Sequence, residues 1–225
     1  MKCTKTNMAV FQTVIALSAV LLAPVLFSGQ NKDLQNLPLD PPPLARRPPT
    51  LLEQAKDRES LTVVGWGDGL SIGSLDDLVR KADVIVEGRI VSANSRISTS
   101  GYAVLTDYTV HVKKVMKAPN HSITQEQEML IHAVGGTVVI QRKRIEVENR
   151  DLARLTTNGE YVFFVKKSPQ APDGEYGILV CGIFGIENGT VRCQYRHCKF
   201  ANGLSDSKES DFLFLLSNKI EHSTE

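Results

Sequence analysis

The sequence has no strong excess of either charge. Its 26 lysines and arginines face 25 aspartates and glutamates, which leaves a formal net charge of +1 at pH 7. Proteins that bind nucleic acids through electrostatics carry a basic patch or stripe. The basic run Arg142-Lys143-Arg144 is followed at once by Glu146 and Glu148, and no aromatic residue lies nearby. We therefore expect no nucleic-acid partner.

No catalytic constellation is visible either. The histidines are dispersed, and no serine stands in a nucleophile-elbow sequence. His111 and His132 fall on the polar sides of predicted strands, where a surface histidine is the expected role. An enzyme needs a nucleophile, a base and oxyanion donors brought together. The sequence therefore favours a non-catalytic protein, and a small hydrolase with an unrecognised site stays as an alternative.

A glycine-rich phosphate loop is also missing. Three glycines surround the only tryptophan in the stretch Gly65–Gly69. They lack the strand–loop–helix context that a phosphate loop requires. We expect Trp66 to pack onto the edge of the domain, and we expect no cofactor.

The clearest positive signal lies at the N-terminus. Lys2 and Lys5 precede an uncharged segment, residues 8–27. This order is typical of a signal peptide, and the length also suits a membrane span. We assign residues 1–29 to a signal peptide or an N-terminal membrane anchor. Both alternatives place the rest of the chain outside the cytoplasm, and the chain would contact the membrane through residues 8–27 if they are not cleaved.

A proline-rich linker is predicted over residues 30–60. Six prolines fall between Pro38 and Pro49, and consecutive prolines favour extended polyproline II over a packed helix. Thr50 is a candidate cap for a short helix over residues 51–58. The remaining residues, 61–225, are expected to form a single mostly β domain.

That domain begins with a short helix that leads into a long strand. Ser74, followed by two acidic residues in the first turn, is a capping-box-like start for a helix over residues 75–82. In the next strand, Val84, Val86 and Ile90 share one face with Gly88. Because an inward glycine often marks a bend, Gly88 is predicted to bend the first strand of a small barrel.

A glycine pair predicts the first hairpin. Gly135-Gly136 is a strong two-residue turn signal. Pairing across it would set Ala133 opposite Val138 on the core face. On the exposed face it would set Glu128 opposite Lys143, as a cross-strand ion pair.

Other patterns complete the expected domain. Apolar residues on both faces predict a central strand over residues 161–167. Asn188-Gly189 predicts a second hairpin, in which Phe184 lies opposite Cys193. Helical spacing predicts a last helix over about residues 207–220. With about six strands and two short helices, the fold class is mostly β.

Cysteines are scarce, and their spacing argues against a metal site. Cys181, Cys193, His197 and Cys198 lie close in sequence but contain no C-x-x-C pair. In an exported protein a disulfide is the better expectation. The second hairpin places Cys181 and Cys198 on the same face, diagonal to one another. We therefore expect a Cys181–Cys198 disulfide, with Cys193 free and buried beside Phe184.

Three stretches resemble a known group of domains. They are ADVIVEGRIVS at residues 82–92, YTVHVKKVMKAPN at 108–120 and NGEYVFFV at 158–165. The pattern resembles exported bacterial domains of uncharacterised function with an OB-like barrel. It is distantly similar to the netrin module and to the N-terminal domain of tissue inhibitors of metalloproteinases. The resemblance implies a small antiparallel OB-like barrel over residues 74–195.

The resemblance does not carry over the inhibitory chemistry. Those inhibitors bind a catalytic zinc through a cysteine at the mature N-terminus, whereas no cysteine occurs here between Cys3 and Cys181. We therefore expect an exported, non-catalytic interaction module that binds a protein or a component of the cell envelope. A protease inhibitor, by analogy of fold, and a small extracytoplasmic hydrolase are the alternatives.

Overall fold

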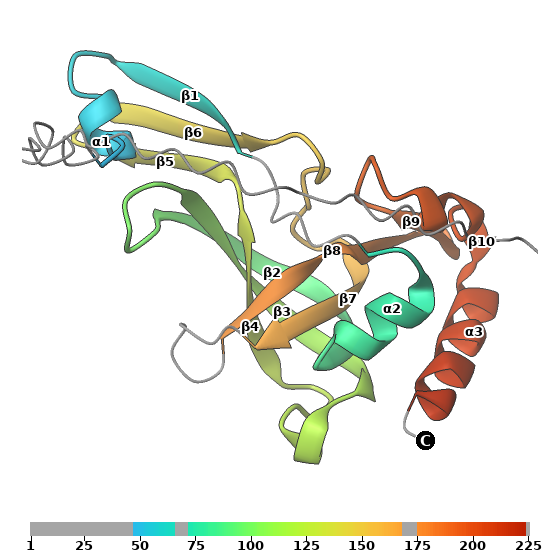
Figure 1. Cartoon of the computed structure of the whole chain (residues 1–225). Helices are drawn as coiled ribbons and strands as arrows, with labels where there is room; N and C mark the ends of the chain where they lie inside the picture. The colour runs from blue at the N-terminus through green and yellow to red at the C-terminus, as the bar shows by residue number, and fades with distance from the viewer. Residues whose placement is uncertain (1–46, 66–71, 168–174, 224–225) are drawn as a thin grey trace, which may run out of the picture. The chain divides into compact units, whose positions relative to one another are not determined.

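The computed structural model describes residues 47–65, 72–167 and 175–223 (Figure 1). The predicted signal or anchor, Trp66 and the prolines up to Pro43 lie outside these residues. The folded unit begins at Arg47. Within the described residues, no helix has the length and apolar character needed to cross a bilayer.

Residues 51–60, which were predicted as part of the linker, belong to the folded unit. Helix α1 (Leu51–Gln54) begins with a capping box, in which Thr50 and Glu53 each bond the other's backbone N–H. Leu51 is 1% exposed and Ala55 is fully buried. The capping box satisfies backbone donors that the end of a helix leaves free, and the two apolar side chains gain burial.

The described residues form a mostly β structure with ten strands, where about six were expected. After α1 the elements are β1 (Ser60–Gly65), α2 (Leu75–Lys81), β2 (Val84–Ile97), β3 (Val104–Lys117), η1 (Pro119–His121), β4 (Glu128–Val134), β5 (Gly136–Ile140), β6 (Lys143–Asn149), β7 (Glu160–Lys167), β8 (Glu175–Glu187), β9 (Thr190–Cys193), η2 (Lys199–Gly203), β10 (Ser207–Lys208) and α3 (Glu209–His222).

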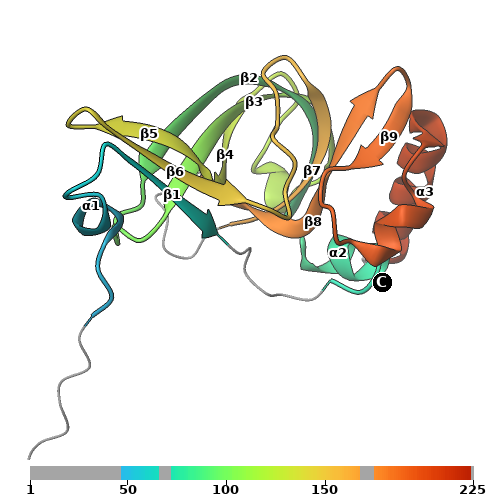
Figure 2. The same ribbon diagram turned by 90° about the horizontal axis from the view of Figure 1, so that it is seen from above.

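Two sheets contain these strands (Figure 2). The larger one has the order β10-β9-β8-β4-β3-β2-β7, and β7 also pairs with β8. Starting from β2, the pairings therefore run through β3, β4, β8 and β7 and return to β2. All of them are antiparallel except β4 with β8, which is parallel. The smaller sheet has the order β1-β6-β5.

The predicted helix and first strand are confirmed. Ser74 caps α2, and its Oγ accepts a hydrogen bond from the N–H of Asp77 at 3.1 Å. The register of β2 against β3 shifts between Glu87 and Gly88. A Cβ atom at Gly88 would lie 2.6 Å from Val110 Cγ1 and 2.7 Å from the carbonyl oxygen of His111. Glycine is needed here because the two strands approach so closely.

The first predicted hairpin is wrong. Strand β4 pairs with β3 and β8, whereas β5 pairs with β6. Gly135 and Gly136, with φ of 118° and 131°, join the two sheets instead of closing a turn. A Cβ atom on Gly136 would collide with the hydroxyls of Thr106 and Ser95. The glycine pair therefore permits close packing against β2 and β3.

The actual hairpin at this place joins β5 to β6. Its turn residues, Gln141 and Arg142, both have positive φ. Ala133 consequently does not face Val138, which pairs with Ile145. Lys143 forms no ion pair with Glu128, because its Nζ donates to backbone oxygens next to α1, including Ala55 O at 2.7 Å.

The later elements agree with the sequence patterns. Strands β8 and β9 form the Asn188-Gly189 hairpin, with Phe184 opposite Cys193. Strand β7 is central, between β2 and β8. In α3, Phe212 and Leu216 are buried.

Helices α2 and α3 cover one wall of the larger sheet (Figure 1). Their apolar residues pack with outward-facing side chains of β7 and β8 in one core cluster. A second cluster consists mainly of side chains from the other face of β2, β3, β4, β7 and β8. Lys117 links β3 to α2, since its Nζ donates to Val79 O at 2.8 Å and to Ala82 O at 2.7 Å. A third cluster lies under α1 and the smaller sheet.

Candidate functional site

The structure brings Cys181 and Cys198 together as a disulfide, with Cα atoms 5.8 Å apart. Cys181 is buried in the same core cluster as Phe184. The register of β7 against β8 jumps between Phe163 and Val165, so the residues around Cys181 form a bulge. Cys181 has a φ of 64° within it, which turns its side chain inward.

Cys193 is free, and it is half-buried rather than buried. Burial raises the pKa of its thiol, so the thiol is protonated and unreactive at neutral pH. Phe184 is fully buried, and its ring lies 5.8 Å from that of Phe164 and 4.9 Å from that of Phe212. These residues stabilise the wall under the helices and do not form a ligand site.

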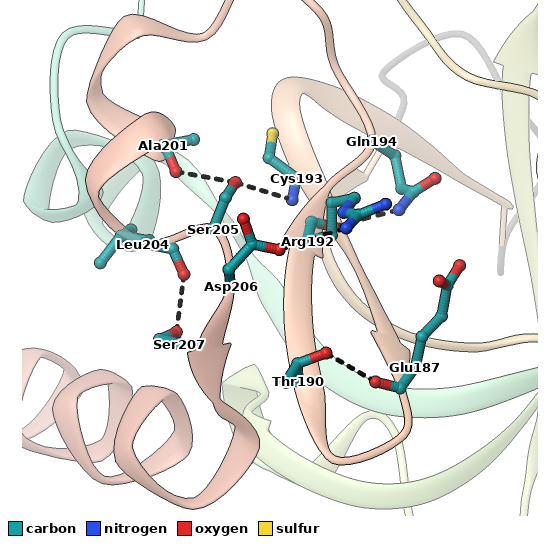
Figure 3. Close-up of polar contacts among 10 residues, drawn as sticks. All are labelled: Glu187, Thr190, Arg192, Cys193, Gln194, Ala201, Leu204, Ser205, Asp206 and Ser207. Carbon is teal, nitrogen blue, oxygen red and sulfur yellow. Dashed lines mark hydrogen bonds and ion pairs between the residues drawn. The ribbon is translucent and has the colours of Figure 1, made fainter.

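Polar groups beside Cys193 are also satisfied locally (Figure 3). Ser205 Oγ accepts from the N–H of Cys193 at 3.4 Å and donates to Ala201 O at 3.1 Å. Arg192 pairs with Asp206 at 3.2 Å. These bonds fasten the segment before β10 to β9, and they explain the local conformation without a ligand.

A different group of polar residues lies on the outer face of β2, β3, β4 and β8. We call it the four-strand cluster; it consists of Arg96, Asp107, His132 and Glu175, one from each strand. Asp107 lies opposite His132 in the β3–β4 register. Arg96 Nε donates to Asp107 Oδ2 at 2.6 Å, and Arg96 Nη2 lies 3.8 Å from Glu175 Oε2. The guanidinium thus links β2 to carboxylates on β3 and β8.

Two polar atoms of the cluster are buried without a hydrogen-bond partner. They are Asp107 Oδ1 and His132 Nδ1. The Asp107 side chain is only 17% exposed, and that of Glu175 is 21% exposed. Leaving such an atom unpaired costs about 1–3 kcal/mol, and such atoms are few in folded proteins. The cluster therefore contains two polar atoms that could each still form a hydrogen bond.

His132 is held in a mostly uncharged state. Burial lowers the pKa of its imidazole, although the carboxylates of Glu175 and Asp107 oppose that shift. The ring packs over the backbone of β8, since a Cβ atom at Gly177 would lie 3.3 Å from His132 Nε2. Sequence patterning placed His132 on a polar surface, whereas its side chain is half-buried.

The cluster lacks the parts of a catalytic centre. Among the described residues, no serine, threonine or cysteine hydrogen-bonds the His132 imidazole. Over the same residues, no group of three or more potential metal ligands comes together. His111 instead pairs with Glu126, and His197 with Asp151. The arrangement can bind a hydrogen-bonding group, and it offers no nucleophile.

A cleft of about 690 Å³ lies on the other face of the same strands. Its walls come from β2, β3, the β4–β5 junction, β6 and the segment 152–157. They include Ala93, Ser95, Thr106, Tyr108, Gly135, Gly136, Glu148, Asn149, Arg154 and Thr156. Several polar groups are already engaged: Thr106 Oγ1 donates to Gly135 O at 2.6 Å and lies 3.0 Å from Ser95 Oγ.

Sequence reasoning missed the four-strand cluster, although a signal for it was present. His132 was placed on the polar face of its strand, and Asp107 lies opposite it on β3. Their proximity depends on the pairing of β3 with β4, and the Gly135-Gly136 pattern had assigned β4 to the wrong neighbour. No protein-family model matches the chain, and no curated protein matches it in sequence.

Proposed function

We propose that the chain is an exported, non-catalytic binding module whose domain is an OB-like barrel. The ring of pairings among β2, β3, β4, β8 and β7 supports the barrel. If these five strands are numbered by their order in the chain, their order around the ring is 1-2-3-5-4. This order suits a five-stranded Greek-key barrel. Export is supported by the lysines and apolar segment at the N-terminus, and by a disulfide, which persists in oxidising compartments.

The partner, a protein or a component of the cell envelope, docks on the four-strand cluster. OB barrels bind ligands on the face of their second and third strands. By analogy of fold, β3 and β4 occupy those places, and they carry Asp107 and His132. Neither side chain belongs to the core cluster that includes residues of α2 and α3.

The unpaired Asp107 Oδ1 is the observation that carries the proposal. Its other oxygen already accepts from Arg96. With His132 neutral, the cluster holds two carboxylates and one guanidinium, so its net charge is negative. A partner that carries a basic group would be attracted by this charge, and hydrogen bonds to charged groups contribute about 1.5–3 kcal/mol.

The test is capture of the partner from the cell envelope with the full-length chain, followed by mass spectrometry. Asp107→Asn removes the charge that attracts a basic group. We expect it to lower recovery of the captured partner at least tenfold. Asp206→Asn is the matched control, because Asp206 is also paired with an arginine but lies beside β9 (Figure 3). We expect it to leave recovery unchanged.

Two outcomes would contradict the proposal. One is equal recovery of the same partner by wild type and Asp107→Asn. The other is turnover of an ester, peptide or glycan substrate that His132→Ala abolishes, which would favour the hydrolase alternative. Inhibition of metalloproteases or serine proteases by the purified chain would instead favour an inhibitor.

A further inference from the structure

The cleft and the four-strand cluster lie on opposite faces of β3. Successive side chains in a strand point to opposite faces, so Thr106 and Tyr108 line the cleft, whereas Asp107 belongs to the cluster. Ala93 and the glycine pair at the β4–β5 junction also line the cleft. The cleft is therefore a separate concave surface, and its volume lies in the range of small-ligand sites, roughly 300–1,000 Å³.

Three charged residues line the cleft: Glu146 and Glu148 come from β6, and Arg154 comes from the segment before β7. Within the described part of the chain, Glu148 and Arg154 make no ion pair and no side-chain hydrogen bond. The neighbouring acidic residues do: Glu146 pairs with Arg144 at 3.1 Å, and Asp151 lies 3.6 Å from His197. Glu148 and Arg154 are thus available to a ligand.

Arg154 is held in place by its neighbours in sequence. Leu155 is 5% exposed and packs in the core enclosed by the larger sheet. The N–H of Thr156 donates to the hydroxyl of Tyr161 at 3.0 Å. Arg154 therefore extends from a segment whose backbone is held in place. This reduces the conformational entropy that is lost when a ligand binds.

Tyr108 supplies a neutral hydroxyl in the same region. Burial raises the pKa of its phenol, and the nearby Arg154 opposes the shift. The phenol consequently stays protonated at physiological pH. It can donate to a carboxylate or accept from an amide without changing the charge of the cleft.

We propose that the cleft binds a short peptide through its two charged ends. Arg154 binds the terminal carboxylate, for which a guanidinium has the matching donor geometry, and Glu148 binds the terminal ammonium. The hydroxyls of Tyr108 and the adjacent threonines face the peptide bonds. A free amino acid carries the same two charges, but these charges lie close together. It would also leave most of the cleft unfilled.

Isothermal titration calorimetry of the purified full-length chain tests this site. The probes are alanine tripeptide with free ends, the same peptide with an acetylated N-terminus, the same peptide with an amidated C-terminus, and free alanine. We expect the free tripeptide to bind, each blocked form to bind at least tenfold more weakly, and free alanine to bind more weakly than the tripeptide.

Variants assign each charge to its residue. Arg154→Gln should weaken binding of the free tripeptide tenfold or more and remove the difference between its free and amidated forms. Glu148→Gln should remove the difference between the free and acetylated forms. Arg150→Gln and Glu187→Gln are controls, because both residues are exposed and lie outside the cleft lining; we expect them to bind like wild type.

The result that overturns the site is an absence of tripeptide binding, or equal affinities for free and blocked peptides. Discrimination that persists in both Arg154→Gln and Glu148→Gln would also reject it. Tighter binding of free alanine than of the tripeptide would reject the peptide as ligand. None of these results bears on partner capture at Asp107, which is measured with other variants.

Discussion

The two walls of the larger sheet differ in what their outward side chains meet. On the β7–β8 wall, Phe164 and Phe184 point outward and are fully buried beneath α2 and α3. On the β3–β4 wall, Asp107 and His132 point outward and contain polar atoms without partners. The first wall is completed by the chain itself. The second keeps two buried polar atoms without a hydrogen-bond partner, and this contrast is the reason for proposing the polar wall as the binding surface.

The helix-covered wall is also fastened by several different contacts. Lys117 caps the end of α2, and Lys219 of α3 lies 2.8 Å from Asp76 of α2. The disulfide adds a covalent link from the β8 bulge to the segment before η2. The polar wall has Arg96 as its main link across strands. We therefore expect substitutions on the two walls to affect different properties, stability on the first and binding on the second.

The largest effect on stability is expected from Phe184→Ala. Phe184 contacts the rings of Phe164 and Phe212, and the truncation would leave a cavity under the helices. Replacing a buried phenylalanine with alanine lowers the free energy of unfolding by about 3–5 kcal/mol. Chemical denaturation of the purified chain, compared with wild type, measures this loss.

Leu130→Ala is the matched substitution on the polar wall. Leu130 lies on the outer face of β4, beside Thr109 and Glu175 in register, and is half-buried. Leu130→Ala removes less buried apolar area than Phe184→Ala does. The free energy of unfolding should therefore fall by about 1 kcal/mol. Equal losses from Phe184→Ala and Leu130→Ala would mean that the two walls do not differ as described.

An intermediate loss is expected at Gly88, where β2 pairs with β3 on one side and with β7 on the other. In Gly88→Ala the new Cβ would overlap Val110 and the carbonyl of His111. Part of this overlap involves backbone, so the strands must separate locally, at a cost of about 1–3 kcal/mol. Differential scanning calorimetry should show a lower Tm. Gly203→Ala is the control, since no atom lies within 4 Å of the added Cβ.

Local patterns predicted the elements whose signals depend on near neighbours. The cap at Ser74, the Asn188-Gly189 turn and the pairing of Cys181 with Cys198 all involve short separations in sequence. Gly135-Gly136 failed because a glycine pair also serves close packing between sheets, and only the position of β2 and β3 decides between the two uses. The parallel pairing of β1 with β6 joins residues more than eighty positions apart, and no local pattern predicts it.

The four-strand cluster shows the same limit at the level of function. Alternation placed His132 on the polar face of its strand, where its side chain lies half-buried opposite Asp107. It could not place Arg96 and Glu175 beside them, because that requires the pairings β2–β3, β3–β4 and β4–β8 together. A site built from one residue on each of four strands follows from topology, and topology depends on contacts between distant segments.

The smallest expected effect is a pH dependence that belongs to the polar wall alone. Burial lowers the pKa of His132 in the folded chain below the ordinary value of a histidine. The unfolded chain then binds more protons as the pH falls below about 6.5, so the free energy of unfolding decreases in that direction and is unaffected above it. The imidazole is half exposed and faces Arg96, Asp107 and Glu175, so solvent and charge screening keep the change below about 1 kcal/mol.

Denaturation at pH 7.5 and pH 5 measures this dependence. His132→Gln should reduce the loss of stability between these two pH values, because glutamine does not titrate. His222→Gln removes an exposed histidine near the end of α3 and should leave the loss unchanged. An identical loss in wild type and His132→Gln would show that His132 is as solvated in the folded chain as in the unfolded one. The polar wall would then lack the enclosed atoms that distinguish it from an ordinary strand surface.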